Sequence, residues 1–127
     1  MKILIIDDDP SIVDIWSIIL QKEGYEIVTA ATGKDGLTLA KKEMPQLVLL
    51  DQIMPDMKGN DVLQILKEDP QTKLIPVALV SNYSESELAQ EAIKQGAADY
   101  IFKFQIEPQD LATKVKTLLQ EANSAQQ

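Results

Sequence analysis

The sequence predicts an α/β domain in which five helices cover both faces of a doubly wound, five-stranded parallel sheet. Four short, continuous apolar runs have the composition of strands that are buried on both faces. They are Ile3–Ile6, Leu47–Leu50, Val77–Val80 and Tyr100–Phe102, and a weaker, more polar run at Ile27–Ala30 supplies the fifth strand. Helical patterns lie between these runs, and this alternation favours parallel strands joined by right-handed crossovers.

The first two helices have clear end signals. Asp9 suits the N-cap of the first helix, Pro10 its first position, and Gly24 follows its end. One face of this helix is apolar and consists of Ile12, Val13, Trp16, Ile19 and Leu20. We therefore expect Trp16 to pack in the core rather than against a partner. The second helix is expected over Lys34–Glu43, before Pro45.

Three more helices follow. The third contains the apolar residues Val62, Leu63, Ile65 and Leu66. The fourth begins with a capping box of Ser84 and Glu87 and ends at Gly96. The fifth begins near Pro108, and we interpret its apolar face as core rather than interface. That face consists of Leu111, Val115, Leu118 and Leu119. The polar segment 123–127 is expected to fray.

Length and composition fit one folded domain. The 127 residues include 45% hydrophobic and 25% charged residues, which excludes a disordered or low-complexity chain. We place the domain at residues 1–122 and a polar tail at 123–127. The net charge of −8 repels phosphate backbones and anionic lipids, so direct binding to nucleic acid or to a membrane is not expected.

The chain contains neither cysteine nor histidine, which limits the chemistry that it can perform. Without cysteine the chain has no disulfide or thiolate nucleophile, and without histidine it lacks the usual general base and zinc ligand. Any bound metal must therefore be held by oxygen atoms. No apolar run approaches the roughly 18 residues of a membrane span. The apolar start at residues 1–6 is also too short for a signal peptide, so we expect a cytoplasmic protein.

Chemically active side chains follow four of the predicted strands. Asp7 and Asp8 follow the first, Asp51 the third, Ser81 the fourth and Lys103 the fifth. These positions share one edge of a parallel sheet, and in the strand order 2-1-3-4-5 the first and third strands are neighbours. Three carboxylates this close repel one another unless they share a cation, and Mg²⁺ fits oxygen ligands best. Together with this ion, a lysine, a hydroxyl donor and a nucleophilic carboxylate are the groups expected of a site that binds and transfers a phosphoryl group.

Each of these residues also has an ordinary structural interpretation. An aspartate after a strand often only caps a helix, as we expect for Asp9. A serine there usually belongs to a turn, and a lysine is normally a solvated edge residue. The functional interpretation depends on the combination, because such residues at the ends of four strands rarely coincide by chance.

Four segments follow a pattern known from one protein family. Leu49–Gly59 has the Met-Pro and the later glycine that follow the family's phosphorylated aspartate. Ile5–Asp9 matches its acidic pair, Val80-Ser81 its hydroxyl residue, and Ala97–Lys103 its fifth strand and lysine. The chain, over Lys2–Glu121, thus resembles the receiver domain of two-component response regulators, the family that includes the single-domain chemotaxis regulator. The resemblance implies a flavodoxin-like fold.

The resemblance also implies self-phosphorylation, with the phosphohistidine of a sensor histidine kinase or phosphotransfer protein as donor. Asp51 would be the nucleophile. Asp8 and Asp51 would bind Mg²⁺ through their carboxylates, Ile53 through its backbone carbonyl, and Asp7 through the ion's water shell. The product would be a regulatory phosphoprotein, not a turnover enzyme, that acts on a downstream protein target or on an output domain outside this chain.

A switch belongs to the same resemblance. Lys103 would pair with one phosphoryl oxygen, Ser81 would swing to bond another, and Tyr100 would rotate inward behind Ser81. The change would be read on the face formed by the fourth helix, fifth strand and fifth helix. Phosphorylation-driven homodimers also occur in the family. Without the resemblance, Tyr100 is an ordinary half-buried strand aromatic.

Two features depart from the family pattern. Phe104 follows Lys103, where the family nearly always has a proline in a cis peptide. A non-proline cis bond costs about 3–4 kcal/mol, so we expect a trans bond and a differently shaped loop. The second feature is the bulk of Ile53, two residues after the aspartate, and of Tyr83, two after the hydroxyl residue. Neither can position a hydrolytic water, so we expect slow loss of the phosphoryl group.

Two other functions fit part of the sequence. A pseudo-receiver would keep the fold as a binding module without phosphorylation, and Phe104 favours it. A phosphohydrolase of the haloacid-dehalogenase type would explain the Asp-x-Asp at residues 7–9 and Ser81-Asn82, but it leaves Asp51 and its Met-Pro without a role. We expect either a stand-alone regulator or a segment of a longer protein.

Overall fold

Five parallel strands form one sheet in the order β2-β1-β3-β4-β5 in this computed structural model. The structure describes residues 1–82, 86–103 and 106–126. The strands are β1 (Lys2–Ile6), β2 (Glu26–Ala30), β3 (Leu47–Asp51), β4 (Val77–Ser81) and β5 (Asp99–Phe102). Each predicted strand is present and one residue longer than expected, and the predicted strand order is confirmed.

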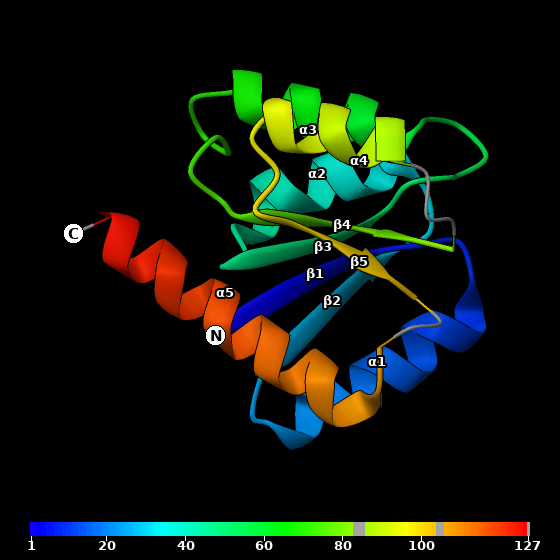
Figure 1. Cartoon of the computed structure of the whole chain (residues 1–127), viewed down its shortest axis with the longest axis vertical. Helices are drawn as coiled ribbons and strands as arrows, with labels where there is room; N and C mark the ends of the chain where they lie inside the picture. The colour runs from blue at the N-terminus through cyan, green and yellow to red at the C-terminus, as the bar shows by residue number, and fades with distance from the viewer. Residues whose placement is uncertain (83–85, 104–105, 127) are drawn as a thin grey trace.

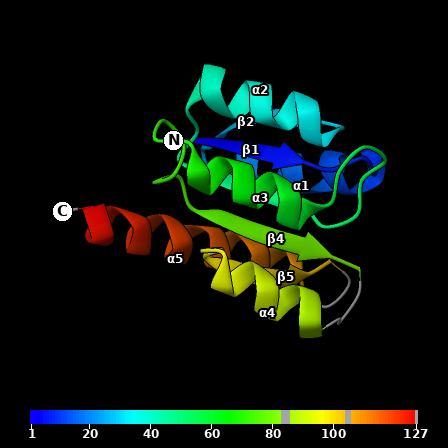
Figure 2. The ribbon, with the colours of Figure 1, turned by 90° about the horizontal axis from the view of Figure 1, so that it is seen from above.

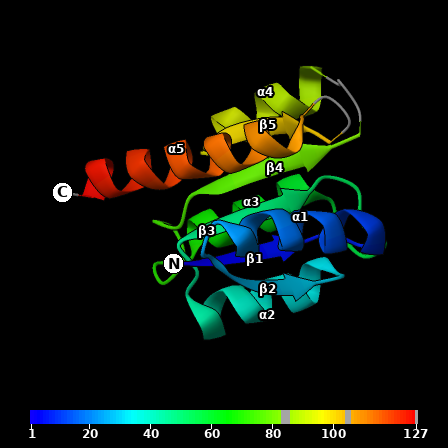
Figure 3. The same ribbon diagram turned by 90° about the horizontal axis from the view of Figure 1, so that it is seen from below.

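Helices cover both faces of the sheet. They are α1 (Pro10–Lys22), α2 (Gly33–Glu43), α3 (Gly59–Glu68), α4 (Ser86–Lys94) and α5 (Pro108–Gln126). Figure 1 shows α2, α3 and α4 on one face and α1 and α5 on the other. The first layer lies in front of the sheet in Figure 2, and the second lies in front of it in Figure 3. None of the helices in the described ranges is long and apolar enough to cross a membrane.

The core has two halves, one on each side of the sheet, because successive strand residues point to opposite faces. Ile3 and Ile5 pack with α1 and α5, whereas Leu4 and Ile6 pack with α2 and α3. Trp16 is 5% exposed in the first half, which confirms its predicted core position. The apolar face predicted for the last helix is buried in the same half, at Leu111, Val115, Leu118 and Leu119.

Capping explains several of the helix ends. The Asp9 carboxylate accepts a hydrogen bond from the Ser11 backbone N–H at 3.0 Å, as expected of an N-cap. Gly24 and Gly96 have φ angles of +92° and +101°, which glycine adopts without steric cost and which stop α1 and α4. The predicted capping residue Ser84 lies outside the described residues.

The last helix is longer than the sequence indicated. α5 continues through Gln126 and so includes most of the segment that we expected to fray. The physical reason is that no glycine or proline follows Pro108, so nothing in the sequence interrupts the helical hydrogen bonds. The described polar residues of this end, Asn123 and Ser124, are exposed to solvent.

A close approach of α3 to β3 fixes the end of the central strand. The Gly59 backbone N–H donates to the Gln52 carbonyl at 2.8 Å. A Cβ atom on Gly59 would lie 2.5 Å from the Asp51 carbonyl oxygen and 2.8 Å from Leu79 Cδ1, so only glycine fits. This contact gives a physical reason for the glycine that follows the Met-Pro sequence.

Candidate functional site

The three aspartates predicted to converge do lie together at the carboxyl edge of the sheet. Asp7 and Asp8 follow β1, and Asp51 ends the neighbouring strand β3. Asp7 and Asp51 are 4% and 5% exposed, whereas Asp8 is open to solvent. One carboxylate oxygen from each residue lies within 4.8 Å of the other two. Such a group of oxygens can hold a hard divalent ion.

Lys103 is buried against this acidic group and is not a solvated edge residue. Its Nζ lies 2.7 Å from Asp7 Oδ2 and 3.2 Å from Asp51 Oδ1. The residue follows β5, and its backbone N–H donates to the Ser81 carbonyl at 2.9 Å, which extends the pairing with β4. The single positive charge of Lys103 therefore faces two buried carboxylates, with the third, on Asp8, beside them.

The net charge of the site favours the binding of a further cation. Burial, and then repulsion from Asp7, raise the pKa of Asp51 to about 7, although Lys103 acts in the opposite direction. Burial alone would lower the pKa of Lys103, but the two carboxylates raise it above its ordinary value. The carboxylates thus carry more negative charge than Lys103 offsets. Their oxygen donors and their mutual repulsion fit a bound Mg²⁺.

A cleft of about 290 Å³ opens directly over Asp51. The residues that line it are Asp8, Asp9, Asp51, Ile53, Ser81, Asn82 and Lys103. Ser81 is 1% exposed in the wall of this cleft, whereas Ile53 is 50% exposed. The structure therefore brings together the predicted nucleophile, lysine, hydroxyl residue and Ile53 around one small cavity.

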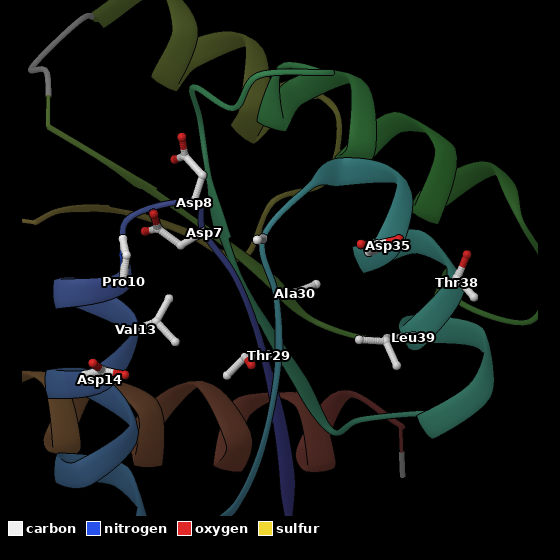
Figure 4. Close-up of a pocket in the computed structure, with 11 residues that line it drawn as sticks. Asp7, Asp8, Pro10, Val13, Asp14, Thr29, Ala30, Asp35, Thr38 and Leu39 are labelled. Carbon is white, nitrogen blue, oxygen red and sulfur yellow. The ribbon is translucent and has the colours of Figure 1, made fainter.

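A second, larger cleft of about 620 Å³ lies between α1 and α2. Figure 4 shows Asp7 and Asp8 at one end of it, and the apolar side chains of Val13 and Leu39 deeper between the helices. Asp35 comes from α2 on the opposite side. Asp8 lines both clefts, so its carboxylate can be approached from either side.

Tyr100, the predicted switch residue, is half-buried on β5 and points toward the interior. Its ring centroid lies 5.5 Å from that of Phe102. Its hydroxyl oxygen accepts a hydrogen bond from Gln52 Nε2 at 3.3 Å. Gln52 is fully buried and pairs with Asn60 on α3. Sequence reasoning missed this amide pair, although a glutamine directly after the apolar strand β3 was a visible signal.

Asp56 was also missed, although it lies in the motif that follows Asp51. Its two carboxylate oxygens accept hydrogen bonds from the backbone N–H groups of Gly33, at 2.9 Å, and Lys34, at 3.0 Å. These bonds lower the pKa of Asp56 below its ordinary value. Asp56 thereby ties the loop after β3 to the N-terminus of α2, where a negative charge is favourable.

Besides Ser84, two residues near the predicted site lie outside the described ranges. They are Tyr83, expected to shield the phosphoryl group, and Phe104, which follows the buried lysine. The trans Lys103–Phe104 peptide and the role of Tyr83 therefore stay predictions.

In the absence of metal, the stability of the protein should depend on the protonation of Asp51. Its pKa is raised to about 7 in the folded chain against 3.8 for the ordinary group, so the folded state binds a proton that the unfolded state lacks between these values. The free energy of unfolding should consequently rise as the pH falls from 8 to 6. Urea unfolding in the presence of a chelator measures this change.

The matched control is Asp51→Asn. This variant removes the titrating group and one of the repelling charges. It should be more stable than the wild type at pH 8 without metal, and its stability should change less between pH 8 and pH 6. Equal pH dependence in the two proteins would show that Asp51 does not carry the raised pKa.

Comparisons with known proteins agree with this geometry. The family model described as response regulator receiver domain matches residues 3–116. A CheY-like response regulator receiver domain protein from Methanospirillum hungatei, known from a crystal structure, is 35% identical in sequence to this chain and superimposes on it with a TM-score of 0.91. The match covers 98% of this chain and 97% of that protein's chain. Protein PilH of Pseudomonas aeruginosa is 35% identical over 92% of this chain and 93% of its own length.

Longer relatives match as well. The DNA-binding dual master transcriptional regulator RpaA of Synechocystis is 37% identical over 93% of this chain. The matched region is 48% of that protein, so the chain spans about half of its length.

Proposed function

The chain belongs to the family of response regulator receiver domains, and on this basis we propose that it accepts a phosphoryl group on Asp51. The donor is the phosphohistidine of a sensor histidine kinase or phosphotransfer protein. The observation that carries the proposal is the buried Asp51 carboxylate, which lies beneath an open cleft and shares the contact of Lys103 with a second buried acid, Asp7. A buried acid with a raised pKa, placed beside a lysine in a cleft, is typical of a reactive group.

Four residues are proposed to hold Mg²⁺ at this site. They are Asp8 and Asp51 through their carboxylates, Ile53 through its backbone carbonyl, and Asp7 through water. The ion supplies positive charge that offsets the repulsion among the carboxylates and the charge of an incoming phosphoryl group. The mutual proximity of the three carboxylates supports this assignment.

The proposed reaction is a direct displacement at phosphorus. A carboxylate oxygen of Asp51 forms the new O–P bond while the P–N bond to the donor's imidazole breaks, and that nitrogen keeps the electron pair and takes a proton from solvent. Lys103 Nζ, 3.2 Å from Asp51 Oδ1, is near enough to pair with a phosphoryl oxygen. The Ser81 hydroxyl, in the wall of the same cleft, is proposed to bind another oxygen.

Phosphorylation is proposed to change a surface of this chain that binds another protein. Ser81 and Phe102 are in register across β4 and β5, and Tyr100 lies two residues before Phe102 on the same side of the strand. A shift of Ser81 toward a phosphoryl group therefore changes the packing beside Tyr100. A downstream protein, an output domain or a second copy of the chain would read the change on the face of α4, β5 and α5.

The mass of the intact protein after incubation with acetyl phosphate tests this function. With Mg²⁺ present we expect a single phosphoryl adduct, and without Mg²⁺ we expect none. Asp51→Asn should lose the adduct, whereas Asp14→Asn should keep it, because Asp14 lines only the neighbouring cleft. An adduct on Asp51→Asn would contradict the proposal. A folded wild type that forms no adduct from either acetyl phosphate or a phosphorylated kinase would favour the pseudo-receiver.

A further inference from the structure

A pair of buried amide side chains joins the end of β3 to the start of α3. Gln52 comes directly after Asp51 and is fully buried, and Asn60, the second residue of α3, is 4% exposed. Gln52 Oε1 accepts from the Asn60 backbone N–H at 2.9 Å. Gln52 Nε2 donates to Asn60 Oδ1 at 2.8 Å. These two bonds hold both side chains in one place.

The partners of the pair also fix which way each amide faces. The Asn60 backbone N–H can only donate, so Gln52 Oε1 must face it and Nε2 must face Asn60 Oδ1 and Tyr100. Asn60 Nδ2 then donates to the Leu88 carbonyl and to Glu91 Oε2 on α4, both at 3.3 Å. The network therefore reaches two elements, α4 and β5, which lie together on one side of α3 and β4 in Figure 2.

Tyr100 is the end of this network on β5. The two hydrogens of Gln52 Nε2 go to Asn60 Oδ1 and to the Tyr100 hydroxyl oxygen. Because Gln52 is fully buried, it can reach the hydroxyl only if that group is turned toward the interior. Rotation of Tyr100 outward would take away the acceptor of one buried N–H, which is unfavourable. All donors and acceptors of this network belong to the chain itself, so its hydrogen bonds do not need a phosphoryl group on Asp51.

We propose that Gln52 and Asn60 are positioning residues that hold Tyr100 inward and α4 against the end of β3 before phosphorylation. The inward position of Tyr100 is the one expected for the phosphorylated protein. The effect of the network on the binding of a phosphoryl group therefore rests on the proposed function. If the chain is already held in that arrangement, less of the binding energy of a phosphoryl group is needed to reach it. By reciprocity, the same network should strengthen the binding of that group.

The test is the solvent exposure of Tyr100 in the full chain labelled with 3-fluorotyrosine, with the resonance assigned through Tyr100→Phe. In the absence of Mg²⁺ and of any phosphoryl donor, we expect a small H₂O-to-D₂O shift of the ¹⁹F resonance in the wild type and at least a twofold larger one in Gln52→Leu. Gln64→Leu, a change at an exposed glutamine of α3, should match the wild type. A wild-type shift as large as that of Gln52→Leu would overturn the proposal.

Asn60→Leu provides a second variant, should Gln52→Leu fail to fold. It removes the bonds to α4 and the acceptor that holds Gln52 Nε2, so it should also increase the exposure of Tyr100, and an unchanged exposure would overturn the proposal. The next measurement is the affinity for beryllofluoride, a phosphoryl mimic, with Mg²⁺ present. We expect binding about tenfold weaker in Gln52→Leu than in Gln64→Leu, and equal affinities would contradict the coupling.

The two measurements separate the two claims. If the wild type binds no beryllofluoride, the proposed phosphoryl site is wrong. The exposure of Tyr100 in the unphosphorylated chain still decides whether Gln52 and Asn60 position it.

Discussion

Replacement of Lys103 with methionine is expected to lower the free energy of unfolding of the metal-free protein by about 3 kcal/mol at pH 8. The Lys103 side chain is 3% exposed and contacts the carboxylates of Asp7 and Asp51, whose side chains are 3% and 7% exposed. Its removal leaves buried negative charge without a cation. Because Lys103 lowers the pKa of Asp51, its removal raises that pKa above about 7, and uptake of a proton by Asp51 then limits the loss. The deficit should therefore shrink as the pH falls from 9 toward 7, where Asp51 of the wild type also takes up a proton.

Lys114→Met is the matched control for this substitution. Lys114 Nζ lies 2.8 Å from Asp99 Oδ2, a distance similar to that in the buried pair, but its side chain is 42% exposed. Exposed pairs contribute about 0.2–1 kcal/mol, so the control should lose little stability. Urea unfolding of both variants, with chelator and with Mg²⁺, measures the difference. Similar losses in the two variants would show that Lys103 is not the cation that offsets the buried acids.

The second large effect is expected at Ile53. Replacement of Ile53 with asparagine should shorten the lifetime of the phosphorylated protein about tenfold, which corresponds to about 1.4 kcal/mol in the activation barrier. Ile53 lines the cleft over Asp51 and is 50% exposed, so it covers the approach to the phosphoryl group with an apolar side chain. An amide at this position can hold the attacking water by a hydrogen bond. Tyr83→Glu is expected to act in the same direction.

Ile65→Asn is the control for Ile53. Ile65 is a similarly exposed isoleucine, 43% exposed on α3, and is not among the residues that line the cleft. Loss of the adduct with time, followed by intact mass after removal of acetyl phosphate, compares the three proteins. A lifetime in Ile53→Asn equal to or longer than that of the wild type would contradict the expected shielding.

The sheet was predictable because its signals are local. Runs such as Val77–Val80 are apolar at every position, as is typical of a strand covered on both faces, and each of the four continuous runs is followed by a polar residue that marks the carboxyl edge. The convergence of Asp7, Asp8 and Asp51 then follows from the strand order. The chemistry of this site could be predicted because the carboxyl ends of parallel strands lie at one edge of the sheet.

The contacts that escaped prediction join residues far apart in the sequence. Asp56 binds the N-terminus of α2, more than twenty positions earlier, and Gln52 reaches Tyr100 on β5. Neither partner can be identified from composition or periodicity, because a single polar residue offers the same donors and acceptors to many neighbours. The burial of Lys103 was hidden for a similar reason, since a lysine after a strand is normally solvated.

Borohydride reduction locates the phosphoryl group, because it converts an aspartyl phosphate to homoserine. The protein is incubated with acetyl phosphate and Mg²⁺, reduced, digested and sequenced by tandem mass spectrometry. We expect homoserine at position 51 and at no other aspartate, and none when Mg²⁺ is withheld. Homoserine at Asp7, Asp8 or Asp9 instead of at position 51 would contradict the assignment of Asp51 as the nucleophile.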